Sequence, residues 1–94
     1  MFLNLTYLAN LDVSNFDTKN VNDMTCMFAG CSKLTFLDVS NFETKNVEYF
    51  GAMFENCQQL KEIDVSNFNT TKAKEIDKMF HKCFAVKKLD VSKF

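Results

Sequence analysis

The chain has 94 residues, of which 47% are apolar and 24% charged, and its 11 lysines nearly balance 12 acidic residues. This composition predicts one soluble, ordered domain and excludes a disordered segment. It also excludes a general nucleic-acid binder, because the formal net charge is only −1.

A six-residue motif returns every 26 residues along the chain. It reads Leu-Asp-Val-Ser-Asn-Phe at residues 11–16 and 37–42, and it recurs with small changes at 63–68 and 89–94. A fixed period without insertions predicts one array of coils in which like positions stack, and we expect this array to be a piece of a longer one. The full units are 11–36, 37–62 and 63–88, flanked by the partial units 1–10 and 89–94.

Each unit begins with a pattern that predicts a short strand. In the second unit, Leu37 and Val39 alternate with Asp38 and Ser40. The apolar side chains would therefore face inward and the polar ones outward. Stacked units would hold such strands parallel, one in each coil.

The second half of each unit predicts a short helix. In the second unit the apolar residues are spaced by three, three, one and three, which traces one face of a helix. Thr44 or Asn46 can cap its start, while Gly30 and Asn56 suit a left-handed stop. The apolar positions are Val47, Phe50, Met53, Phe54 and Cys57.

Two phenylalanine rows and one cysteine row are assigned to the core, because their strict period favours packing over an aromatic cage for a ligand. Stacked cysteines would hold their Cβ atoms about 4.8 Å apart, beyond the roughly 3.5–4.5 Å that a disulfide prefers. We therefore expect free thiols, with Cys26 exposed and more reactive because it lies outside the row. The predicted core residues are Phe16, Phe28, Phe42, Phe54, Phe68, Phe80, Cys31, Cys57 and Cys83.

An aspartate row is the polar feature that this predicted fold leaves unexplained. Its members would lie about 4.8 Å apart, where each neighbouring like pair costs roughly 1 kcal/mol in water. Three explanations stay open: hydrogen bonds from the serine row or the backbone together with water, a shared cation, or a basic partner. The row consists of Asp12, Asp38, Asp64 and Asp90.

The last position of the unit varies, being Phe36, Glu62 and Lys88 in the three full units. Alternation puts these residues on the same exposed face as the aspartate row, where an exposed Phe36 indicates a contact. Alternatively, Glu62 and Lys88 simply form an ion pair, worth at most about 1 kcal/mol. The candidate binding residues are Asp12, Asp38, Asp64, Asp90, Phe36, Glu62 and Lys88.

Catalysis is not expected from this composition. The serine row has no base beside it, and His81, the single histidine, falls on the outer side of the predicted helix. We therefore predict no enzyme, no cofactor and no metal site. No stretch is long and apolar enough to cross a bilayer, so direct membrane insertion is not expected.

The segment Leu34-x-x-Leu37-x-Val39-x-x-Phe42 resembles the strand half of a leucine-rich repeat. The fuller pattern, which continues with Thr, Met-Phe, Cys and Leu, resembles the 26-residue repeat of BspA-like bacterial surface proteins over all 94 residues. With the periodicity, this predicts an α/β repeat solenoid, a right-handed leucine-rich-repeat-like coil with one short parallel strand and one short helix per unit. One departure is that common leucine-rich repeats place Asn where Phe42 stands.

The resemblance implies surface-exposed or lipid-anchored proteins of bacteria, mycoplasmas among them, with roles in adhesion and host interaction. We accordingly expect a non-enzymatic protein-interaction module at the cell surface, which binds a host or neighbouring protein through the strand face or the outer helices. The alternative is a structural protein that stacks end to end through uncapped termini, since residues 1–62 are acidic and 63–94 basic. Cation binding by the aspartate row is the least favoured function.

Overall fold

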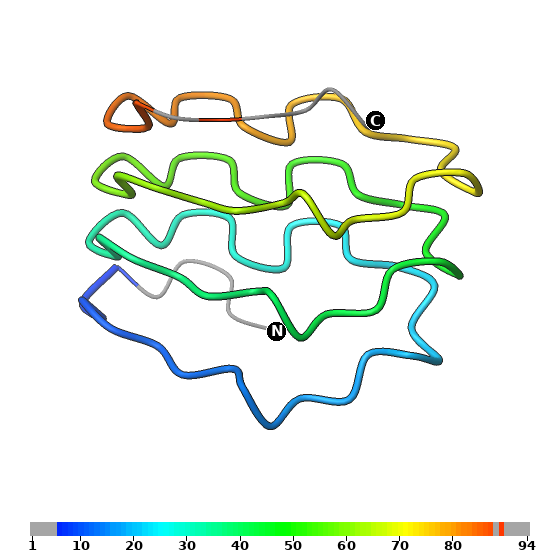
Figure 1. Cartoon of the computed structure of the whole chain (residues 1–94). Coiled ribbons are helices and arrows are strands. Elements are labelled where there is room, and N and C mark those ends of the chain that lie inside the picture. Colours follow the sequence, from blue (N-terminus) through cyan, green and yellow to red (C-terminus); the bar gives the residue numbers. More distant parts are fainter. Residues whose placement is uncertain (1–5, 88, 90–94) are drawn as a thin grey trace.

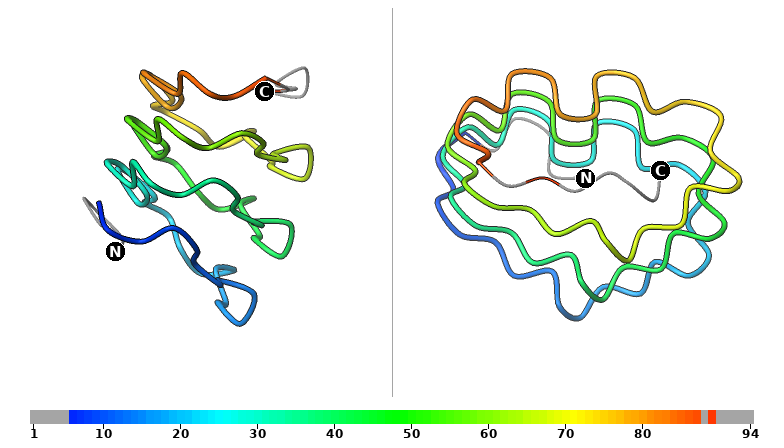
Figure 2. Two further views of the ribbon diagram at one scale, coloured as in Figure 1. Left: turned by 90° about the vertical axis from the view of Figure 1, so that its left-hand side faces the viewer. Right: turned by 45° about the horizontal axis from the view of Figure 1, so that its top comes forward.

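The chain winds as a stack of similar coils, one for each 26-residue unit (Figures 1 and 2). The computed structural model describes residues 6–87 and 89. Backbone hydrogen bonds join neighbouring coils one residue short of the 26-residue repeat: the Phe28 N–H donates to the Met53 carbonyl and the Phe54 N–H to the Met79 carbonyl, both at 2.9 Å. Neighbouring coils are therefore in register, one unit apart.

The described residues contain no helix and no extended strand. We predicted an α/β solenoid, a right-handed leucine-rich-repeat-like coil with one strand and one helix per unit, and this prediction is wrong. Regular pairing within this part of the chain is limited to three isolated parallel bridges. They join Asp23 to Tyr49, Phe36 to Glu62, and Tyr49 to Glu75.

Tight turns replace the predicted helix. In the second coil, the N–H groups of Met53, Glu55 and Cys57 each donate to the carbonyl three residues earlier, at 3.1–3.2 Å. Ala52 and Asn56 adopt positive φ angles of 56° and 64°. An α-helix requires negative φ throughout, so a left-handed residue at every fourth position breaks it into successive turns.

The turns direct backbone N–H groups toward the next coil instead of along a helix axis. Every second N–H of this segment donates to a carbonyl of the third coil, at 2.8–3.0 Å. These bonds satisfy backbone groups that a helix would have paired internally. The pairs are Phe50 to Glu75, Ala52 to Asp77, Phe54 to Met79, and Asn56 to His81.

The positions equivalent to Ala52 and Asn56 are left-handed in the other coils too, with φ between 57° and 78°. Gly30 and Asn56 thus adopt the conformation that the sequence favoured, but inside turns and not at the end of a helix. Lys82 adopts it as well, although lysine has no intrinsic preference for it. The remaining left-handed residues are Cys26, Gly30, Lys78 and Lys82.

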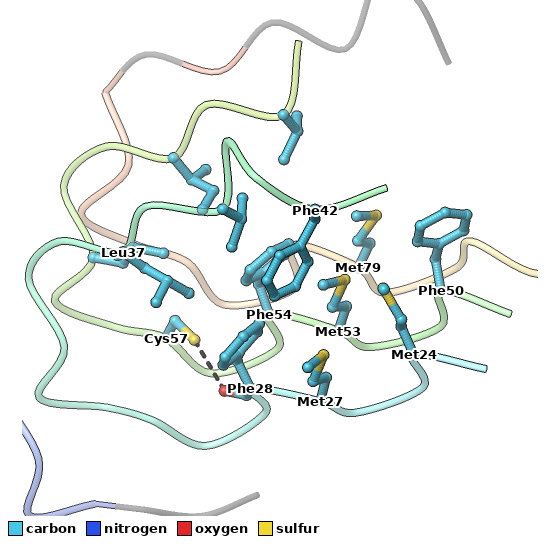
Figure 3. Packing of buried hydrophobic residues seen from close by; sticks show 14 of the residues in the cluster. Met24, Met27, Phe28, Leu37, Phe42, Phe50, Met53, Phe54, Cys57 and Met79 are labelled. Atoms are coloured by element: carbon cyan, nitrogen blue, oxygen red, sulfur yellow. Dashed lines mark hydrogen bonds between the residues drawn. The ribbon is translucent and has the colours of Figure 1, made fainter. Parts of the chain in front are cut away.

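Phenylalanine rings stack through the centre of the coils (Figure 3). The Phe54 ring lies 5.6 Å from the Phe28 ring and 5.4 Å from the Phe80 ring, and the ring planes differ by less than 10°. Phe28, Phe42, Phe54 and Phe68 are buried, whereas Phe80 is partly buried. Phe16, which we assigned to the core, remains 40% exposed.

Polar side chains also bond one coil to the next. The Thr44 hydroxyl, 2% exposed, accepts the Asn69 N–H at 2.7 Å and donates to the Asn69 carbonyl at 3.3 Å. Thr18 bonds the N–H and carbonyl of Glu43 in the same way, at 2.8 and 3.1 Å. A row of threonines therefore replaces backbone pairing at this position.

The cysteine row forms a third kind of contact between coils. All four cysteines are free thiols. The Cys57 thiol donates to the Phe28 carbonyl at 3.2 Å (Figure 3), and the Cys83 thiol donates to the Phe54 carbonyl at 3.0 Å. Burial raises the pKa of Cys57 to about 12 and also raises that of Cys83, so both thiols stay protonated at neutral pH.

Candidate interaction surface

A groove of about 650 Å³ lies on the face where we expected the binding residues. Its lining comes from residues 36–40 of one coil, residues 62–66 of the next, and Leu89. The Phe36–Glu62 bridge holds these two segments in parallel register. We call this site the acidic groove, because Asp38, Glu62 and Asp64 line it.

Side-chain alternation sets which residues face the groove. Leu37 and Val39 are 2% and 1% exposed and pack into the core, whereas Asp38 and Ser40 between them are exposed. Strict alternation therefore survives in this segment even though no strand ladder forms. Phe36 is two residues before Asp38 and therefore faces outward like it, so that this phenylalanine is 57% exposed.

Serine N–H groups fix the aspartate carboxylates. The Ser40 N–H donates to Asp38 Oδ1 and the Ser66 N–H to Asp64 Oδ1, both at 2.9 Å. Asp12 accepts the same bond from Ser14 at 2.9 Å. Each is a local turn in which the side chain satisfies a backbone donor two residues later.

These bonds keep the carboxylates charged. The serine hydroxyls, and secondly the serine N–H groups, lower the pKa values of Asp12 and Asp38 below the ordinary 3.8. Repulsion from Asp64 and Asp12 acts on Asp38 in the opposite direction. Of the three explanations for the aspartate row, hydrogen bonding from the serines is the one that the structure supports directly. Repulsion between neighbouring aspartates nevertheless persists.

The structure brings together four of the candidate binding residues in the groove: Phe36, Asp38, Glu62 and Asp64. Asp12 belongs to the same row but does not line the groove. Lys88 and Asp90 lie outside the described residues, so the expected Glu62–Lys88 pair remains a prediction.

Asparagine side chains next to the groove were not among the candidates. The Asn67 amide donates to the carbonyls of Ser40 and Phe42 at 3.0 and 3.1 Å. Asn41 makes corresponding bonds to the first coil, the shortest at 3.0 Å to the Ser14 carbonyl. The three full units share an Asn at this position, and this identity was the sequence signal for the ladder: the residues are Asn15, Asn41 and Asn67.

The described part of the chain holds no group of three His, Cys, Asp or Glu side chains arranged to bind a metal ion. His81 is exposed on the turn segment, and Cys26 is partly exposed. No helix of sufficient length and apolarity to cross a membrane occurs among residues 6–87.

Comparison with known proteins identifies the family of the chain. A family model described as "Mycoplasma protein of unknown function, DUF285" matches residues 1–94. No curated protein and no solved structure matches the chain. Because the match covers the whole length, the chain belongs to this Mycoplasma family.

Proposed function

We propose that this member of the Mycoplasma family is a non-enzymatic protein-interaction module, and that the acidic groove is its binding face. The observation that carries the proposal is the Phe36 ring, 57% exposed beside carboxylates that are held in place. Exposed aromatic side chains in concave sites are typical anchors of protein interfaces. The resemblance to BspA-like repeats supports an adhesion-type role at the cell surface.

The distribution of residues along the unit favours this face. Core positions repeat, as Val39 and Val65 do, whereas the outward positions Phe36 and Glu62 of the same two coils differ. Repeat proteins obtain specific binding surfaces by varying exposed positions on a constant scaffold. A groove flanked by such positions is the natural place for a partner.

Site-specific photocrosslinking tests the proposal. Benzoylphenylalanine replaces Phe36 in one preparation and Phe84, which is 73% exposed and does not line the groove, in another. Each preparation is irradiated with surface proteins of mycoplasma cells and of host cells. We expect a discrete crosslinked protein from position 36 that Glu62→Lys abolishes.

The control position separates the alternatives. Crosslinking of the same protein from position 84 alone would move the interface away from the groove. Absence of a discrete product at both positions, with either source of protein, would refute the role as an interaction module. Retention of the tyrosine fluorescence and circular dichroism of the unmodified chain shows that each variant is folded.

A further inference from the structure

We propose that the acidic groove binds an extended peptide segment that carries a basic side chain two residues away from an apolar one. The basic group would lie between the carboxylates of Asp38 and Asp64, and the apolar side chain against the Phe36 ring. This inference rests on the proposed function, because it names the chemistry of the partner at the same site.

Charge complementarity indicates a basic occupant. The described lining carries three carboxylates, on Asp38, Glu62 and Asp64, and no basic side chain. Phosphate groups of a nucleic acid or a lipid would be repelled from such a site. The exposed apolar groups that border it, Phe36 and Leu89, favour a partner that also carries an apolar side chain.

Two fixed carboxylates favour one shared cation. Stacked coils place like positions roughly 4.8 Å apart, and Asp38 and Asp64 are like positions of neighbouring coils. Their serine N–H bonds, at 2.9 Å, hold both groups before any ligand arrives, so little side-chain entropy is lost on binding. A guanidinium group has donors on two edges and can bond both carboxylates, while removing their mutual repulsion.

Spacing along the coil sets the spacing in the ligand. Phe36 and Asp38 are two residues apart on one face of a nearly extended segment, which corresponds to about 6.6 Å. An extended peptide also repeats its side-chain direction every second residue. An apolar residue and a basic residue at positions i and i+2 therefore match the groove, whereas adjacent residues would point to opposite sides.

Fluorescence anisotropy with synthetic peptides tests the inference on the full 94-residue chain. The probe is a labelled peptide that repeats Leu-Ser-Arg-Ser; one control peptide carries the same residues with Leu and Arg adjacent, and another has Glu in place of Arg. We expect the probe to bind most tightly. The double change Asp38→Asn with Asp64→Asn should weaken binding by about tenfold or more.

A matched variant separates the groove from general attraction of cations. Asp23 is also exposed and accepts the Thr25 N–H at 2.9 Å, and hydrogen bonding from Thr25 likewise lowers its pKa, but it does not line the groove. Asp23→Asn should leave the affinity within about twofold of wild type. Asn keeps the side-chain acceptor in all three positions, so the turns persist.

The outcomes distinguish this inference from the proposed function. Two results would overturn the inference that the groove binds a basic residue. One is an equal loss of peptide affinity in Asp23→Asn and in the double variant, and the other is equal affinity for all three peptides. A crosslink from position 36 to a protein partner would then still support the interaction module. Binding of the probe that selectively shifts the Ser40 and Ser66 amide signals in NMR spectra would place the basic group at the aspartate pair.

Discussion

Replacing Thr44 by Val removes a hydroxyl that bonds two coils while nearly preserving the side-chain shape. The Asn69 N–H loses a bond of 2.7 Å and the Asn69 carbonyl one of 3.3 Å. A buried backbone group without a partner costs about 1–3 kcal/mol. Because Asn69 is itself exposed, water can reach part of the site, and we take about 2–3 kcal/mol for the pair.

The added methyl group offsets part of this loss, since burying a methyl in place of a hydroxyl contributes about 0.8 kcal/mol. The expected net decrease in the free energy of unfolding is therefore about 1–2 kcal/mol. Urea denaturation followed by circular dichroism and tyrosine fluorescence measures it. The unfolding midpoint should fall without a change in slope if the denatured state is unaffected.

Thr70 provides the control, because it occupies the same row in the third unit but its hydroxyl bonds no described residue. Thr70→Val should change the free energy of unfolding by less than about 0.5 kcal/mol. If Thr44→Val is no more destabilising than Thr70→Val, then the threonine row does not hold the coils together and our reasoning is refuted.

Three other expectations concern acid stability, turn conformation and thiol reactivity. The lowered pKa values of Asp12 and Asp38 add stability at pH values above 3.8, the ordinary aspartate pKa, and this stability is lost as the pH falls through the folded-state pKa values. The melting temperature of Asp12→Asn and Asp38→Asn variants should therefore fall less steeply at acid pH than that of the wild type. An unchanged acid dependence would contradict this. Gly30→Ala, at φ 78°, should cost about 1 kcal/mol in urea denaturation. Gly51→Ala should instead add about 0.4–1 kcal/mol, because its Cβ would meet nothing closer than 3.7 Å; equal effects would disprove the turn assignment. Mass spectrometry after iodoacetamide treatment should show Cys57, with a pKa of about 12, unmodified in the folded chain and modified in urea.

The 26-residue spacing predicted which residues lie side by side, but not the local conformation between them. Phe28 and Phe54 stack as like positions because equal spacing places them at the same point of each coil. The spacing of Phe50, Met53, Phe54 and Cys57 satisfies a helix, yet it satisfies a run of four-residue turns equally well. The spacing of apolar side chains along the sequence does not indicate whether the φ angles between them are negative or positive.

The left-handed positions explain why the helix was predicted wrongly. Gly30 and Asn56 signal a left-handed residue, but Cys26, Ala52 and Lys78 adopt the same conformation without any such preference. Hydrogen bonds between coils accompany this conformation: the Cys26 and Ala52 N–H groups donate to the Gly51 and Asp77 carbonyls, and the carbonyls on either side of Lys78 accept bonds from the second coil. Such contacts between units cannot be inferred from the sequence of one unit alone. The tertiary contact overrides the local propensity here.

The candidate surface was partly predictable, because the sequence pattern showed which side chains face outward but not the shape of the surface that they form. Strict alternation from Phe36 to Ser40 indicated which side chains face outward, and Phe36, Asp38, Glu62 and Asp64 do line one groove. The serine N–H bonds to the aspartates were an open alternative. The groove itself depends on how the two segments are spaced in three dimensions, which the sequence does not specify.

The hydrogen bonds between coils have a consequence for how such an array can lengthen during evolution. Those made by side chains such as Thr18, Asn41 and Cys57 span 25 to 29 residues, about one unit, wherever they occur in the described chain. Loop-closure entropy depends on this separation and not on the total length. A tandem duplication of 26 residues would therefore add a coil without changing the closure cost of any existing contact, so selection could vary the number of grooves while leaving each one intact.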